Sequence, residues 1–117
     1  MRSIKFNLSK KDANGWDAAV RMTEGYFSTS LKADQLLAQL PAEFIGQSRA
    51  RCQSLFLGAL RHGHRTRAAL TGLIRKKPKA RVDAILLVTG YELLEAEQER
   101  HPKIVHHAVE RSKQLVN

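Results

Sequence analysis

The sequence predicts an all-α protein, a compact bundle of about six helices. Apolar residues recur at the three- and four-residue spacing of amphipathic helices through most of the chain. No segment shows the alternation of apolar and polar residues that is typical of a half-buried strand. The three prolines, Pro41, Pro78 and Pro102, fall between the periodic segments, where they separate helices rather than interrupt them.

Length and composition favour one globular domain spanning residues 1–117, of which 43% are apolar. The longest apolar run, residues 84–88, is far short of the ~20 residues that cross a bilayer. The basic start of the chain lacks the apolar run of a signal peptide. Cys52 has no second cysteine to pair with and lies among apolar helical positions, so we predict a core residue in a cytoplasmic protein.

The first three helices are expected near residues 14–27, 31–40 and 46–62. Asn14 is a suitable N-cap for the first helix, with Asp17 three residues later. The apolar stripe of the first helix consists of Trp16, Ala19, Val20, Thr23, Tyr26 and Phe27. The inner face of the third consists of Cys52, Leu55, Phe56, Ala59 and Leu60. Gly63 is expected to break the chain before the next helix.

Three more helices are expected at residues 65–76, at 80–97, and from Pro102, which suits the first turn of a helix. Pro78 stops the fourth helix. The inward-facing residues are expected to be Ala69, Leu70, Leu73 and Ile74 in the fourth, Val82, Ile85, Leu86, Thr89 and Leu93 in the fifth, and Ile104, Val105, Ala108, Val109, Ser112, Leu115 and Val116 in the sixth.

Two glycines, Gly58 and Gly90, lie deep inside predicted helices. A glycine in a helix interior costs about 1 kcal/mol relative to alanine. We therefore expect each to mark a close approach of two helices, where a side chain would clash.

Positive charge is concentrated in the middle third of the chain. Residues 44–82 hold ten Lys or Arg and no Asp or Glu, whereas residues 83–117 hold four basic and six acidic residues. A cluster of one sign repels itself, which favours a polyanionic partner over simple solubility. The predicted RNA-binding residues are Arg49, Arg51, Arg61, Arg65, Arg67, Arg75, Lys76, Lys77, Lys79 and Arg81.

The sequence contains no credible active site, metal site or cofactor motif. No glycine pair is followed by the Lys-Ser or Lys-Thr of a phosphate loop, and no segment has the G-x-G-x-x-G pattern of a dinucleotide loop. The histidines at 62–64 and 101–107 have poor spacing for metal ligands. Glu92, Glu95, Glu97 and Glu99 are expected to form a solvated face. The few aromatic residues fall mostly on inward stripes, which favours contact with phosphates over stacking on bases.

Three segments together resemble the NusB-like RNA-binding domain family. They are "SRARCQSLFLGALRH", "ARVDAILLVTGYELL" and "HPKIVHHAVERSK", which follow the family's order and spacing over residues 47–113. The forms of the first two are closer to the N-terminal domain of Sun/RsmB-type rRNA cytosine-C5 methyltransferases. This resemblance implies a helical domain that holds ribosomal RNA for a following catalytic domain with an S-adenosylmethionine site, outside these 117 residues. The alternative branch is the stand-alone transcription antitermination factor, which binds RNA together with a ribosomal protein.

Two departures from the family pattern affect these expectations. Glu92 stands where the family has a glutamine. The sequence ends where the family continues into a last helix, which implies either a fragment or a short stand-alone member. The apolar surface that such a helix covers is then expected to promote homo-oligomers. A DNA-binding helix-turn-helix protein and a protein-interaction domain remain alternatives to RNA binding.

Overall fold

The computed structural model describes residues 15–116, and within that range the chain forms five α-helices, one short 3-10 helix and no β-strand. The elements are α1 (Gly15–Ser28), α2 (Ala33–Leu37), α3 (Gly46–Leu70), α4 (Ala80–Glu95), η1 (Gln98–Arg100) and α5 (His101–Leu115). The all-α prediction is confirmed. The expected N-cap, Asn14, lies outside the described residues.

The prediction of about six helices is wrong by one, because the chain does not break at Gly63. The expected third and fourth helices form a single 25-residue helix, α3. Gly63 is buried in its middle, and a Cβ atom there would lie 3.3 Å from the Leu87 side chain of α4. The helix instead ends at Leu70, and Gly72 turns the chain with a φ of 90°, which glycine adopts without strain. Packing against α4 thus offsets the low helix propensity of Gly63.

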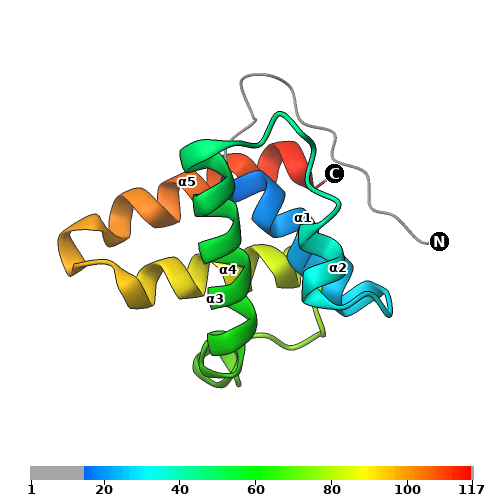
Figure 1. Cartoon of the computed structure of the whole chain (residues 1–117). Helices are drawn as coiled ribbons and strands as arrows, with labels where there is room; N and C mark the ends of the chain where they lie inside the picture. Colours follow the sequence, from blue (N-terminus) through cyan, green and yellow to red (C-terminus); the bar gives the residue numbers. More distant parts are fainter. Residues whose placement is uncertain (1–14, 117) are drawn as a thin grey trace.

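Helix α1 lies at the centre of the fold and contacts α2, α3 and α4. Helices α4 and α5 run side by side in opposite directions, joined through η1, and α3 crosses α4 (Figure 1). Trp16, Met22, Phe56, Leu87 and Val88 are among the fully buried side chains between them. The Cα radius of gyration, 13.6 Å, is close to the ~13 Å expected of a compact domain near 100 residues. No helix among residues 15–116 is long and apolar enough to span a membrane.

The inward faces predicted for α1 and for the first part of α3 largely agree with the structure. Trp16 and Val20 of α1, and Cys52, Leu55 and Phe56 of α3, are buried. The pattern fails at the far end of α1. Tyr26 and Phe27 are exposed, because α1 ends beside the loop that follows α3 rather than beneath another helix.

The expected core faces of the later segments need larger corrections. Residues 69, 73 and 74 are exposed, because the predicted fourth helix stops at Leu70 and its apolar side never meets the core. Of the predicted stripe of α4 only Ile85 is buried, while Val82, Leu86, Thr89 and Leu93 are half-buried. The other buried residues of α4 are Ala84, Leu87 and Val88. Of the seven residues predicted to face inward from α5 and the residue after it, only Ile104 and Ala108 are buried.

The crossing of α3 and α4 is close at both glycines, which confirms the prediction for Gly58 and Gly90. A Cβ atom on Gly58 of α3 would clash with the Tyr91 ring of α4. A Cβ atom on Gly90 of α4 would clash with the Thr66 side chain of α3. Each helix therefore supplies one glycine against a side chain of the other. The lost helix propensity is offset by contacts between the two helices that a side chain would prevent.

Candidate nucleic-acid interface

Three of the ten predicted RNA-binding residues are held by acids from other parts of the fold. Arg51 pairs with Glu92 at 3.1 Å, and Arg67 pairs with Asp83 at 2.8 Å. Arg81 pairs with Glu24 at 3.0 Å and also donates to the backbone carbonyl of Leu115 at 2.9 Å. The charge excess of residues 44–82 is therefore partly balanced in three dimensions by carboxylates outside that range.

Glu92 and Glu24 differ from ordinary surface acids. The Glu92 side chain is only 11% exposed and accepts a hydrogen bond from Trp16 Nε1 at 2.7 Å as well as the one from Arg51. The prediction that Glu92 belongs to a solvated face is thus wrong. Burial raises the pKa of the Glu24 carboxyl, and the charge of Arg21 opposes that rise. Arg51 and Arg81 therefore form ion pairs between helices: Arg51 connects α3 to α4, and Arg81 connects α4 to α1.

The other seven predicted residues have no acidic partner within ion-pair distance among residues 15–116. They are Arg49, Arg61, Arg65, Arg75, Lys76, Lys77 and Lys79. Arg49 is half-buried near the start of α3. It precedes Arg65 by sixteen residues, which is about 24 Å along a helix, so it stands apart from the others.

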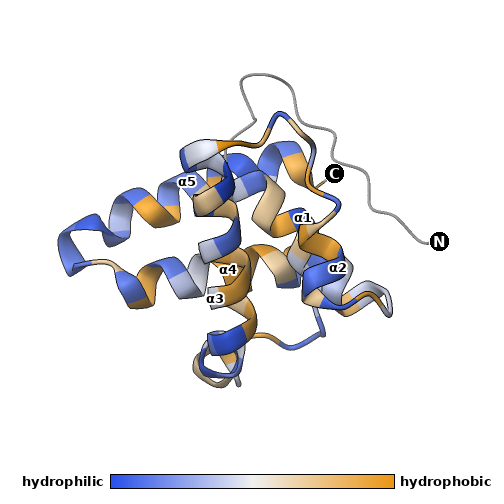
Figure 2. Cartoon of the chain, viewed as in Figure 1, coloured by the Kyte–Doolittle hydropathy of each residue, from blue (hydrophilic) through white to orange (hydrophobic). Residues whose placement is uncertain are grey.

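The remaining six are exposed and lie on the later part of α3 and in the loop that follows it. We call this set the α3–loop surface: Arg61, Arg65, Arg75, Lys76, Lys77 and Lys79. Arg61 and Arg65 are one turn apart on the face of α3 opposite to its buried residues. The other four lie in the loop between α3 and α4, and all six are exposed. Figure 2 shows hydrophilic residues along the later part of α3 and in this loop. The sequence expected residues 71–76 to be helical, whereas they follow the end of α3 at Leu70 and lie in the loop.

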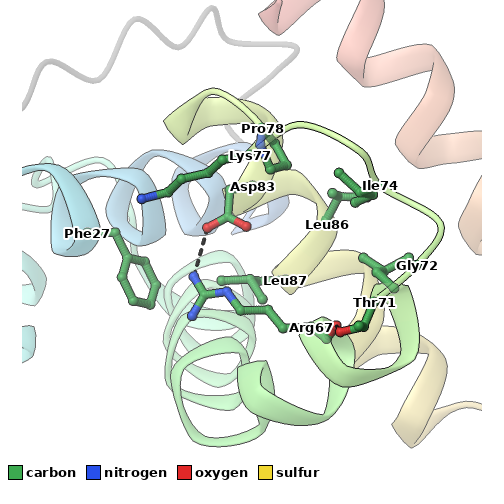
Figure 3. Close-up of a pocket in the computed structure, with 11 residues that line it drawn as sticks. Phe27, Arg67, Thr71, Gly72, Ile74, Lys77, Pro78, Asp83, Leu86 and Leu87 are labelled. Carbon is green, nitrogen blue, oxygen red and sulfur yellow. Dashed lines mark hydrogen bonds and ion pairs between the residues drawn. The ribbon is translucent and has the colours of Figure 1, made fainter.

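A pocket lies between the loop, the end of α1 and the start of α4 (Figure 3). We call it the Phe27 pocket; its volume is about 560 Å³. In Figure 3, Phe27 and the amine of Lys77 lie to the left of the ion pair between Arg67 and Asp83, and Gly72 and Ile74 lie to its right. Leu70, Leu86 and Leu87 supply apolar lining. The pocket thus combines apolar, aromatic, cationic and anionic groups within one small volume.

Phe27 is 46% exposed, and the guanidinium carbon of Arg67 lies 4.7 Å from the centroid of its ring. Sequence reasoning missed this exposed aromatic residue, because Phe27 continues the apolar spacing of α1. Only the end of α1 at Ser28 and the position of the α3–α4 loop expose it.

The histidines in the described range make contacts that their sequence spacing does not reveal. The His62 ring stacks on Tyr91, with an interplanar angle of 10° and centroids 5.7 Å apart. His107 packs edge-on against Trp16, and His101 lies within hydrogen-bond distance of the Leu93 and Ala96 carbonyls. Within residues 15–116, no group of three or more His, Cys, Asp or Glu side chains is placed to hold a metal ion.

A second hollow, an apolar groove of about 640 Å³, separates α4 from α5. Its lining includes Val82, Leu86, Val105 and Val109, of which Val105 and Val109 are about half exposed. These residues belong to the two stripes that the sequence predicted to face the core. The groove holds no acidic side chain and one lysine, Lys113.

The fold and the surface together define a compact helical protein with a basic face and an adjoining mixed pocket. The chain matches no protein-family model, no curated protein and no solved structure.

Proposed function

We propose that this chain is an RNA-binding helical domain that docks RNA through phosphate contacts from the α3–loop surface. The observation that carries the proposal is the set of six exposed basic side chains with no acidic partner among residues 15–116. Elsewhere in the fold, basic residues do find partners, such as Arg51, Arg67 and Arg81. Unpaired like charges destabilise a folded protein by repulsion, and a polyanion removes that cost.

The kinds of side chain on this surface suit a nucleic-acid backbone. Arginine binds phosphate in a bidentate manner, and lysine supplies a point charge. Phosphate contacts give affinity and orientation but little choice of sequence. RNA rather than DNA, and ribosomal RNA in particular, is supported by the resemblance of residues 47–113 to NusB-like domains.

Within that family resemblance, we favour a domain that positions ribosomal RNA for a separate methyltransferase domain, which would carry the S-adenosylmethionine site. The stand-alone antitermination factor, acting with a ribosomal protein, is the alternative. The two are distinguished by whether a ribosomal protein increases the affinity of the chain for RNA. An increase supports the antitermination factor.

The test is RNA binding measured by fluorescence anisotropy over a range of salt concentrations. If five of the six side chains of the α3–loop surface meet phosphates, log affinity should fall with log salt at a slope of about −3.5 to −4.5. The double variant Arg61→Glu/Arg65→Glu should bind more weakly, with a slope shallower by about 1.5, because two contacts are lost.

The matched control is Arg100→Glu/Lys103→Glu, which changes the net charge equally at exposed positions in the acidic third of the chain. It should leave the slope nearly unchanged. Equal losses from both double variants would show that the charge is diffuse and would refute the α3–loop surface. If the parent chain binds no RNA even at low salt, RNA binding itself is wrong. Tighter binding to duplex DNA than to RNA would favour a DNA-binding function.

A further inference from the structure

The Phe27 pocket adjoins the loop part of the α3–loop surface, because Lys77 lines the pocket together with Thr71, Gly72 and Ile74 of the same loop. A strand of RNA with a phosphate on Lys77 would pass the mouth of the pocket. The pocket volume of about 560 Å³ lies within the range of about 300–1,000 Å³ that is usual for small-molecule sites. One base of the strand can therefore enter it.

The lining of the pocket has the groups that an unstacked base requires. Proteins bind single-stranded bases by stacking them on aromatic rings or arginine planes. Phe27 and Arg67 supply one group of each kind, with the guanidinium carbon of Arg67 over the Phe27 ring at 4.7 Å from its centroid. Leu86 and Leu87 supply apolar lining. Lys77 lies on the same side of the pocket as Phe27 (Figure 3), where it can meet the phosphate attached to the base.

Asp83 lies in the pocket where it can discriminate between bases. Its Oδ2 accepts a hydrogen bond from Arg67 at 2.8 Å, and a carboxylate has acceptor capacity for further donors. The Asp83 side chain is partly exposed and lines the pocket. Carboxylates on proteins accept hydrogen bonds from the exocyclic amino group of cytosine. Adenine and guanine also carry an exocyclic amino group, whereas uracil has none and offers one N3–H donor flanked by two carbonyl oxygens that a carboxylate repels. Arg67 offsets the repulsion between Asp83 and RNA phosphates.

We propose that the Phe27 pocket holds one unstacked RNA base that bears an exocyclic amino group, stacked on the Phe27–Arg67 pair and hydrogen-bonded to Asp83. This inference rests on the proposed function, because the α3–loop surface must first hold the strand.

The test uses three single-stranded RNA 12-mers of equal charge: oligo(C), oligo(U), and an abasic ribose-phosphate chain. Because stacking contributes about 1–3 kcal/mol per base, oligo(C) should bind at least about fivefold more tightly than the abasic chain. Oligo(U) should bind more weakly than oligo(C).

Phe27→Leu should reduce the oligo(C) affinity by a similar factor and leave the affinity for the abasic chain unchanged, whereas Phe27→Tyr should retain the preference for oligo(C). Asp83→Asn should narrow the gap between oligo(C) and oligo(U), because an amide also donates to a carbonyl.

The control for the leucine variant is Leu94→Ala, another exposed apolar side chain, which lies outside the pocket. It should retain the preference for oligo(C). Equal affinity of the parent for all three chains would overturn the base pocket and leave phosphate binding intact. A preference for oligo(C) that survives Phe27→Leu would place the base elsewhere and also overturn the inference. If no chain binds, the proposed function and this inference both fail.

Discussion

Arg111 of α5 donates two hydrogen bonds to the carboxylate of Asp17 in the first turn of α1, from Nη2 to Oδ2 at 2.6 Å and from Nε to Oδ1 at 3.1 Å. Asp17 is 1% exposed, so this bidentate pair is buried at one end and connects the first and last helices of the described chain. Arg111 is therefore a structural residue, although its exposed neighbours on α5 gave no indication of this in the sequence.

The first prediction concerns this pair. Arg111→Met should lower the free energy of unfolding by about 3–5 kcal/mol, because a buried carboxylate loses a charged partner. Urea unfolding followed by circular dichroism measures the change. Lys103→Met, on the exposed face of the same helix, should change the stability by less than about 0.5 kcal/mol. Similar stabilities for the two variants would show that the ion pair contributes nothing to the fold.

The second prediction concerns the crossing of α3 and α4. Gly58→Leu and Gly90→Leu should each destabilise the fold by about 1–3 kcal/mol through overpacking. Gly90→Ala should also destabilise it, and Thr66→Ala should recover part of that loss by removing the Oγ1 and Cγ2 atoms that the new Cβ meets. Thermal melts of the single and double variants measure the coupling.

Gly63→Ala is the control for the glycine variants. The new Cβ would meet only the tip of the flexible Leu87 side chain at 3.3 Å, and alanine gains about 1 kcal/mol of helix propensity. The variant should therefore be as stable as the parent or slightly more so. A large loss would indicate that α3 needs glycine at this position.

The third prediction separates two arginines of α3 that look equivalent in the sequence. Arg61→Glu should leave the stability nearly unchanged, because Arg61 is exposed and pairs with no acid among residues 15–116. Arg67→Glu should cost about 1–2 kcal/mol, since it loses the contacts with Asp83 and Phe27 and places two carboxylates together. Urea unfolding of both variants measures the difference. Equal stabilities would mean that the Arg67 contacts are unimportant.

The fourth prediction concerns Cys52, which is buried, as the sequence predicted. Burial raises the pKa of its thiol to about 12, against the opposing charge of Arg49. The native thiol should react with a thiol reagent at pH 8 only as fast as the protein unfolds, and at once in guanidinium. Rapid labelling of the native protein would contradict this.

The raised pKa of the Cys52 thiol makes the free energy of unfolding depend on pH. The thiol of the unfolded chain ionises near its ordinary pKa of 9.0, whereas the folded thiol stays neutral up to about 12. Above pH 9 the unfolded state therefore binds fewer protons, and the stability that Cys52 contributes is lost as the pH rises from 9 to 12. Cys52→Ala should show a smaller decrease in stability over that range.

The sequence by itself determined the fold class, most of the helical segments, the two close approaches at Gly58 and Gly90, the burial of Cys52 and the region of excess positive charge. These features depend on local periodicity, on local composition or on the absence of a side chain, all of which are visible in one dimension. The resemblance to NusB-like domains came from the same local patterns and stays a prediction.

Only the tertiary structure decided which of those residues are free to act. Gly63 continues a helix because Leu87 of α4 packs against it, and Arg51, Arg67 and Arg81 are held by acids that lie 41, 16 and 57 residues away. Phe27 is exposed because α1 ends where the α3–α4 loop passes. Each of these outcomes depends on a contact between segments far apart in the chain, and helical spacing carries no information about such contacts.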